Sequence, residues 1–314
     1  EEMIMKKGIA LILGLTIWVS GTSTVMAEEN ISEVNSVYTC QNTYESRLPL
    51  EVTYDITLGE IEEDILNYIA FNKLDVVYGS DQYLELLNEF TFYPADNLDD
   101  YMIKYYSAYA SVYRSTEDIK LELDKTINDI RNENIQEEIQ MKKELLQIVG
   151  VEPAKVTYNV AGAQKYAADY AMVNNYKYPE YGSDCTNYAS QIIHEGGGLP
   201  TTSQWNIWAG TGTLAWKSWV NVGAFCTYWG EVRGNIGNTC STLAKVNQYA
   251  EPGDFLVWRN QSTLEYEHTQ FVQSKTNGEV YCSQHSMPYY NKRLNSRYTE
   301  SSFKGNIVYQ LDFT

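Results

Sequence analysis

The spacing of apolar residues divides the chain into a helical first half and a mixed second half. Apolar side chains recur at three- and four-residue steps in three segments, residues 61–69, 84–90 and 102–113. This spacing predicts amphipathic helices. The longest predicted helix covers residues 116–148, where one apolar stripe lies opposite many charges. Gly150 and Pro153 follow it and mark a predicted domain boundary.

The second half begins with helices and ends with strands. Residues 160–176 are alanine-rich and predict a helix, and a polar turn then leads to Cys185 at the start of another helix. Gly196 and its two following glycines end that helix, and residues 218–229 predict one more. After residues 251–254, four strand-like segments follow: FLVW, HTQFVQS, EVYCSQHS and GNIVYQLDF. This order predicts an α+β fold with an antiparallel sheet.

The charge is distributed very unevenly. Residues 1–150 hold 11 basic and 28 acidic side chains, whereas residues 151–314 hold 12 and 13. The contrast predicts two domains, an acidic, mainly helical one over residues 28–152 and a second one over residues 153–314. No basic stripe is present that could neutralise phosphates, which argues against a nucleic-acid partner. The acidic helical domain is instead a candidate surface for a protein partner.

The N-terminal residues have the pattern of an export signal. Two lysines precede an apolar run of about a dozen residues, and small residues lead up to Ala27. The run is shorter than the ~20 residues that span a bilayer. We therefore expect a signal peptide over residues 1–27, cleaved after Ala27, and a secreted protein that is extracellular or associated with a cell wall.

Five cysteines limit the possible chemistry. They are Cys40, Cys185, Cys226, Cys240 and Cys282. The odd number means that at least one thiol is free or pairs outside the chain. Cys226 and Cys240 could form a disulfide, but no CxxC pair or zinc-finger spacing occurs. Cys185 itself could be a nucleophile, a metal ligand, half of a disulfide or a small packed residue.

The chain has three histidines, and two of them lie on predicted strands. His268 begins one strand and His285 ends the next, so that neighbouring antiparallel strands could bring the two rings together. His194 lies late on the Cys185 helix, where its ring suits the negative end of the helix dipole. A zinc site made of His268, His285 and a cysteine lacks any recognised ligand spacing. We therefore predict no metal and no cofactor.

A thiol hydrolase needs the residue types that this pattern supplies. The nucleophile is a thiolate, and a helix start and a nearby imidazolium both lower the thiol pKa. A third polar group orients the imidazole. Backbone N–H groups at the helix start can stabilise an oxyanion. Cys185, His268 and His285 fit the roles of nucleophile, base and orienting residue.

The sequence also resembles a known family over about residues 158–314. The stretch SDCTNYASQIIHEGGGLP, followed by tryptophan-rich sequence, PGD and a strand that begins with histidine, resembles the putative amidase domain. That family is related to NlpC-type and CHAP-type cell-wall hydrolases, which share a papain-like fold. The resemblance implies a papain-like domain with Cys185 as nucleophile, His268 as general base and His285 as orienting residue. It also implies that Asp184 binds a free amine of the substrate.

The expected function is therefore a cysteine-dependent amidase or peptidase that acts on peptidoglycan stem peptides or related short peptides. We place Asp184, Asn187 and Tyr181 as substrate-binding residues beside the nucleophile. Thr186 and Asn187 stand where many NlpC-type enzymes have Ser-Gly, so the substrate preference of those enzymes does not transfer directly. Two alternatives remain open: a cysteine transamidase that uses an amine in place of water, and a non-catalytic binding protein on a hydrolase-like fold.

Overall fold

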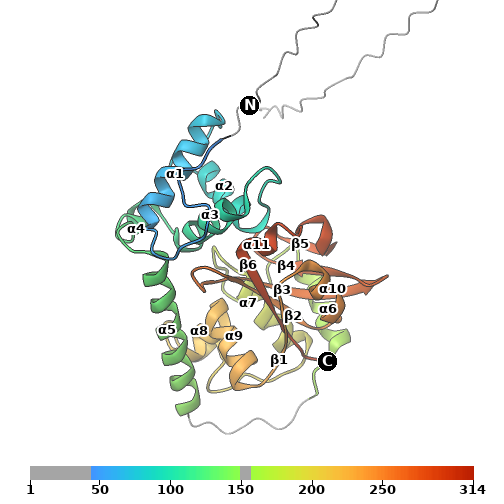
Figure 1. The fold of residues 1–314 in the computed structure, drawn as a ribbon. Coiled ribbons are helices and arrows are strands. Elements are labelled where there is room, and N and C mark those ends of the chain that lie inside the picture. Colours follow the sequence, from blue (N-terminus) through green and yellow to red (C-terminus); the bar gives the residue numbers. More distant parts are fainter. Residues whose placement is uncertain (1–43, 149–156) are drawn as a thin grey trace, which may run out of the picture. The chain divides into compact units, whose positions relative to one another are not determined.

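A six-stranded antiparallel sheet organises the second half of the chain (Figure 1). The computed structural model describes residues 44–148 and 157–314, so that the predicted signal peptide, Cys40 and the predicted boundary after residue 152 lie outside the described residues. The strands are β1 (Ile236–Cys240), β2 (Phe255–Asn260), β3 (Tyr266–Thr276), β4 (Glu279–Gln284), β5 (Tyr289–Arg293) and β6 (Asn306–Leu311). Their order across the sheet is β1-β6-β2-β3-β4-β5.

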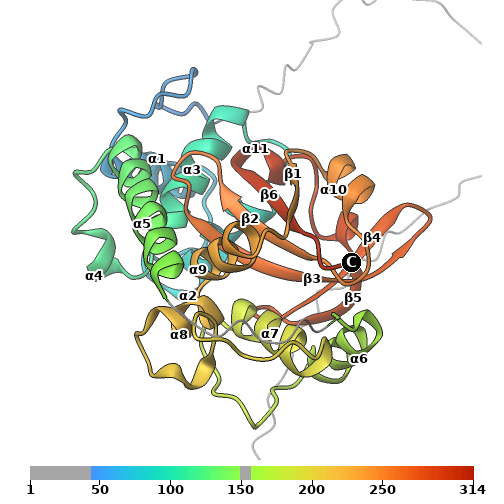
Figure 2. The ribbon, with the colours of Figure 1, turned by 90° about the horizontal axis from the view of Figure 1, so that it is seen from below.

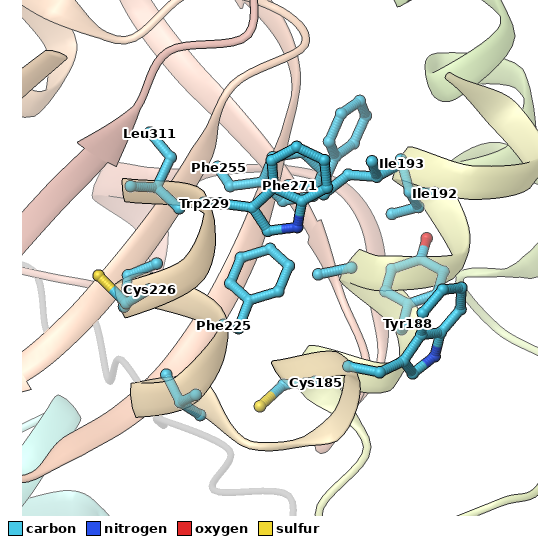
Figure 3. Packing of buried hydrophobic residues seen from close by; sticks show 14 of the residues in the cluster. Cys185, Tyr188, Ile192, Ile193, Phe225, Cys226, Trp229, Phe255, Phe271 and Leu311 are labelled. Atoms are coloured by element: carbon cyan, nitrogen blue, oxygen red, sulfur yellow. The ribbon is translucent and has the colours of Figure 1, made fainter. Parts of the chain in front are cut away.

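Alternating side chains along the strands build two cores, one on each face of the sheet. On β2, Phe255 and Val257 belong to one core, whereas Leu256 and Trp258 belong to the other. The period of two is that of a strand covered on both faces. Figure 2 shows α6 and α7 on one side of the sheet and α10 and α11 on the other. Figure 3 shows the aromatic middle of the first core, with Cys185 at its margin.

The predicted α+β class is confirmed, and the sheet has two strands more than predicted. Strand β1 (IGNTC) pairs with β6, and β5 (YYNKR) pairs with β4. Both strands lie at an edge of the sheet, and most of their side chains are exposed or only partly buried. An edge strand needs few apolar residues, so neither segment has the alternation that marks a buried strand.

The helices of the first half are amphipathic, as predicted, but the longest one is interrupted. They are α1 (Leu58–Phe71), α2 (Asp81–Phe92), α3 (Asp100–Val112), α4 (Thr116–Ile119) and α5 (Ile127–Gln147). The single helix predicted over residues 116–148 is therefore wrong. Thr126 and Asp129 form a capping box that starts α5 anew. The preceding turn accepts hydrogen bonds from the first N–H groups of α1, including Leu58 N to Lys125 O at 2.9 Å.

Short helices connect the sheet to the Cys185 region. They are α6 (Val160–Tyr170), α7 (Cys185–Gln191), α8 (Leu214–Val220), α9 (Val222–Cys226), α10 (Leu243–Tyr249) and α11 (Ser302–Gly305). Two π-helical turns, Ile192–Gly196 and Thr227–Val232, extend α7 and α9. Among the described residues, no helix is both long and apolar enough to cross a membrane.

Buried polar contacts join the helical segment (residues 44–148) to the sheet segment (residues 157–314). The Arg259 guanidinium lies 2.6 Å from the Glu138 carboxylate on α5, and both side chains are largely buried. The Tyr266 hydroxyl donates to the other oxygen of Glu138 at 3.0 Å. Ser111 and Thr263 hydroxyls meet at 2.8 Å. Residues 44–314 accordingly form one compact unit.

We expect Glu138→Gln to destabilise the folded protein. The substitution removes the charge that compensates the buried Arg259 guanidinium, at a cost of about 2 kcal/mol in the free energy of unfolding. Urea unfolding followed by circular dichroism measures the change. Asp169→Asn is the matched control, because its ion pair with Lys165 is exposed and contributes little. Equal losses in the two variants would contradict a structural role for the Glu138–Arg259 pair.

Candidate active site

Cys185 is the first residue of α7, and the helix start around it is left uncapped. Asp184 occupies the N-cap position, but its carboxylate makes no cap hydrogen bond. One Asp184 oxygen accepts from Asn187 Nδ2 at 2.8 Å, and the other lies 2.7 Å from His285 Nδ1. The first N–H groups of a helix have no partner within the helix. Those of α7 therefore remain available beside the Cys185 thiol, which is 2% exposed.

Strand β3 brings His268 to this helix start. The ladder between β3 and β4 begins only at the pair of Phe271 and Ser283, so the first residues of β3 lack a β4 neighbour. The start of α7 packs there, and the Thr186 and Thr269 hydroxyls lie 3.4 Å apart. His268 is thereby close enough to the Cys185 thiol for each side chain to shift the pKa of the other.

The two side chains shift each other's pKa in opposite directions. Burial on its own raises the pKa of the Cys185 thiol. The charge and contact of His268, helped by Thr269 and Thr186, outweigh burial and hold that pKa below its ordinary value. Burial likewise opposes a charged imidazole, but Cys185 and a hydrogen bond to Gln284 raise the pKa of His268. Both shifts favour a thiolate–imidazolium pair.

The other described cysteines are also buried and free, yet they show the opposite behaviour. Burial raises the pKa of Cys226 to about 12 and that of Cys240 to about 11. The pKa of Cys282 is raised further by the same cause. Among the described thiols, Cys185 alone has a lowered pKa, which separates a candidate nucleophile from packed residues. The disulfide considered for Cys226 and Cys240 is not formed.

Gln284, not His285, contacts the His268 ring, which corrects the prediction from sequence. His268 Nε2 lies 2.8 Å from Gln284 Oε1, so the Nδ1 side of the ring is left for the thiol. Gln284 Nε2 donates to the backbone oxygens of Ser286 and Met287 at 3.0 and 3.2 Å. Gln284 is thus firmly oriented and has the place expected for the third member of the site.

His285 supports the nucleophile turn instead. Its Nδ1 lies 2.7 Å from Asp184 Oδ2, and its Nε2 lies 2.8 Å from the backbone oxygen of Tyr170. Both partners are acceptors, so neither ring nitrogen is free for His268. The ring also stacks on Tyr188, with centroids 4.0 Å apart and planes inclined by 6°. His285 therefore fixes Asp184 and the residue after it, Cys185.

The three predicted substrate-binding residues divide into two groups. Asn187 is 1% exposed, donates to Asp184 and Pro179, and accepts from Trp219. Both Asp184 oxygens accept hydrogen bonds within the protein, one from Asn187 and one from His285. These two residues support the turn, and their role in substrate binding stays a prediction. The Tyr181 hydroxyl accepts from Trp216 Nε1 at 3.2 Å, and Tyr181 lines a cavity, so its binding role stays a prediction.

Two cavities flank the turn that precedes Cys185. The larger, about 550 Å³, is lined by Ser183, Trp216 and Glu267 from the sheet segment and by Phe92 from the helical segment. The smaller, about 240 Å³, is lined by Tyr181 and other residues of the turn. The Phe92 ring packs edge-on against the His268 ring, with centroids 5.9 Å apart. The helical segment thus contacts the base directly, which the sequence did not indicate.

Comparison with known proteins supports the family inferred from the sequence. Residues 157–308 match the family model of the putative amidase domain, just under half of the chain. The resemblance is confirmed for these residues, and amidase-type hydrolysis is the activity class that it supports. The match includes Cys185, His268 and Gln284 but not the helical segment. No curated protein and no solved structure matches the chain.

Metal-dependent hydrolysis has no candidate ligand cluster in the described part of the chain. No group of three or more histidine, cysteine, aspartate or glutamate side chains there is arranged to hold a metal ion. His268 and His285, the histidines of the zinc alternative, have separate partners. His194 lies apart from both, with Nδ1 2.7 Å from the backbone oxygen of Leu199.

We expect a small alkylating reagent such as iodoacetamide to modify Cys185 faster than the equally buried Cys226, Cys240 and Cys282 at neutral pH. Only the thiolate reacts, and the lowered pKa of Cys185 keeps it populated below the ordinary thiol pKa of about 8.5. The rate falls as the pH drops through the lowered pKa. Peptide mapping by mass spectrometry, measured over a pH series, identifies which cysteine has reacted.

His268→Ala is the informative comparison for this measurement. Without the imidazole, burial is the dominant influence on Cys185, so its pKa rises and the rate at neutral pH falls by about tenfold or more. His194→Ala serves as the control and leaves the rate unchanged. An identical pH profile in wild type and His268→Ala would exclude an activated thiol.

Proposed function

We propose that the protein is a cysteine-dependent amidase or peptidase with Cys185 as nucleophile, His268 as acid and base, and Gln284 as orienting residue. The Cys185 thiolate attacks the carbonyl carbon of an amide. The His268 imidazolium then gives its proton to the leaving amine, and an acyl-enzyme thioester forms. His268, now neutral, takes a proton from water, which attacks the thioester and releases the acid.

One observation carries this proposal. Of the four described thiols, all buried, only Cys185 has a lowered pKa, and the cause is the histidine that hydrolysis requires. A structural cysteine in the same apolar surroundings has a raised pKa, as Cys226 and Cys282 do. A non-catalytic binding protein has no need for this charged pair in its interior.

The uncapped start of α7 supports the same chemistry. A tetrahedral intermediate places negative charge on the former carbonyl oxygen, and fixed N–H donors stabilise it. Asp184 leaves these N–H groups free because its carboxylate is held by Asn187 and His285. The backbone N–H groups at the start of α7 are therefore the proposed oxyanion donors. We also propose a papain-like fold for the sheet segment, because its candidate nucleophile starts a helix that packs on an antiparallel sheet.

The cavities favour a short peptide as substrate. The two cavities adjoin the turn before Cys185, and Ser183 and Asp184 in their walls directly precede the proposed nucleophile, so each cavity can take part of a short peptide. The larger cavity has the acidic Glu137 and Glu265 and also the basic Arg114 and Lys217. Burial raises the pKa of Glu267, another lining residue, to about 8, so that side chain is mostly protonated at neutral pH. This mixture of charges suits a zwitterionic peptide better than a polyanion. Peptidoglycan stem peptides are such molecules, and we propose them as the substrate of an exported enzyme.

We expect the wild-type protein to release new amino and carboxyl groups from purified peptidoglycan and Cys185→Ala to release none. Loss of the nucleophile removes the acyl-enzyme route entirely. End-group labelling and mass spectrometry of the soluble fragments measure the release. Cys282→Ala, at a buried thiol with a raised pKa, is the matched control and should keep activity per folded molecule. Equal release by wild type and Cys185→Ala would refute the proposed mechanism.

Gln284 and His285 provide a second test, because substituting Gln284 should lower the catalytic rate, whereas substituting His285 should lower the folding stability. Gln284→Met keeps the size of the side chain but removes the acceptor of His268 Nε2, and should lower kcat about 10- to 100-fold. His285→Ala leaves the buried Asp184 carboxylate without its partner and should cost about 3 kcal/mol of folding stability. Steady-state kinetics and urea unfolding separate the two effects. The reverse pattern would restore His285 as the orienting residue.

A further inference from the structure

A chain of buried hydrogen bonds leads from Trp258 to the candidate base. Trp258 Nε1 donates to Gln270 Oε1 at 2.7 Å, and Gln270 Nε2 donates to Gln284 Oε1 at 2.7 Å. Gln284 Oε1 lies 2.8 Å from His268 Nε2. Trp258, Gln270 and Gln284 are each at most 1% exposed, so water does not compete for these bonds. The register supports the arrangement, since Trp258 on β2 pairs directly with His268 on β3.

The direction of this chain follows from the chemistry of the indole. An indole N–H can only donate, so the Gln270 amide must turn its oxygen to Trp258 and its nitrogen to Gln284. An amide nitrogen also only donates, so Gln284 must present its oxygen. The Gln284 nitrogen is held separately by two backbone oxygens, those of Ser286 and Met287. The Gln284 orientation therefore has two supports, the backbone oxygens that accept from its nitrogen and the Gln270 nitrogen that donates to its oxygen.

The last link determines the protonation of His268. Gln284 Oε1 is an acceptor, so His268 Nε2 must carry a hydrogen in both the neutral and the charged ring. The neutral ring then has its lone pair on Nδ1, the nitrogen left to face Cys185. The opposite tautomer would put an N–H on Nδ1, and that nitrogen could not accept a proton from the thiol or from water.

We propose that Gln270 and Trp258 are positioning residues that hold His268 in the Nε2–H tautomer. They do so through Gln284 without touching the substrate or the reacting atoms. Gln270 Nε2 also lies 2.6 and 2.9 Å from the hydroxyls of Tyr289 and Tyr298, and on this proposal its two hydrogens serve the Gln284 oxygen and one of these hydroxyls. The catalytic meaning of this inference rests on the proposed function, but the tautomer itself can be measured without any substrate.

The experiment is nitrogen NMR of histidine-labelled protein, which distinguishes protonated from unprotonated ring nitrogens. The chain has three histidines, so single substitutions assign every signal. The wild type should show hydrogen on Nε2 of His268 at all pH values at which the protein is folded. Q270E inverts the polarity of the chain once the new side chain is ionised, because a carboxylate accepts from Trp258 but cannot donate to Gln284. Burial favours the protonated acid, which can donate as the amide does, so the comparison is made at the alkaline end of the pH range in which the protein is folded. There we expect signal from the Nδ1–H tautomer in Q270E, together with a changed pH profile of Cys185 alkylation.

The control is Gln273→Glu on the same strand. Gln273 is also buried, and its side-chain nitrogen donates to the backbone oxygen of Gln164, outside the chain of bonds to His268. This variant should leave the His268 tautomer and the pH profile of Cys185 alkylation unchanged. Trp258→Phe keeps an aromatic ring, removes the indole N–H that donates to Gln270, and serves if Q270E does not fold. We expect it to mix the two tautomers.

The outcomes separate the inference from the proposed function. An unchanged His268 tautomer in folded Q270E or Trp258→Phe would overturn the inference whatever the enzyme's activity. A changed tautomer together with wild-type hydrolysis would support the inference and contradict the assignment of His268 as the base. A changed tautomer with lost hydrolysis and a shifted pH profile supports both.

Discussion

On the proposed function, the site depends on keeping a thiolate and an imidazolium paired in the protein interior. Charges are costly there unless they are paired and hydrogen-bonded. Cys185 meets this condition through His268, and His268 through Gln284. Two features of the surrounding structure make room for the pair. The first residues of β3 have no partner on β4, and the N-terminus of α7 has no side-chain cap. The buried cysteines elsewhere lack a histidine partner, and their thiols remain neutral.

The acidic helical segment also contains a buried charge, and tyrosine hydroxyls are among the groups that stabilise it. The Asp64 carboxylate is 2% exposed and accepts from Tyr44, Ser46 and Tyr106 and from the backbone of Arg47, at 2.7 to 2.9 Å. Hydroxyl and backbone donors thus satisfy this buried carboxylate. The same helices contribute Glu138 to Arg259 and Phe92 to His268, so the segment is part of the site's surroundings.

Local position and the family resemblance together were sufficient to name Cys185, at a helix start, and His268, at a strand start, as candidates. The change of apolar pattern was sufficient for the α+β class. Gln284 was missed because choosing between it and the adjacent His285 requires the register of β4 on β3, and a shift of one residue reverses the facing side chain. The break before α5 was visible in principle, since Thr126 and Asp129 have the capping-box spacing. The contact of Phe92 with His268 joins residues 176 positions apart, and no local pattern reports it.

The side chains of the motif around Cys185 mainly fix α7 within the protein, and they say little about the substrate. Asn187 bonds to Asp184 and Trp219, and the Ser190 hydroxyl donates to the Trp219 backbone and accepts from Trp205. The Gln191 oxygen accepts from Tyr166. These side chains point into the protein, so a match to the motif transfers the placement of the nucleophile but not the choice of substrate. On the proposed function, that choice depends on the cavity walls, and one wall includes Phe92 and Arg114 of the helical segment, outside the matched residues. Proteins that share the amidase domain but differ in this wall can therefore cleave different amides with the same chemistry.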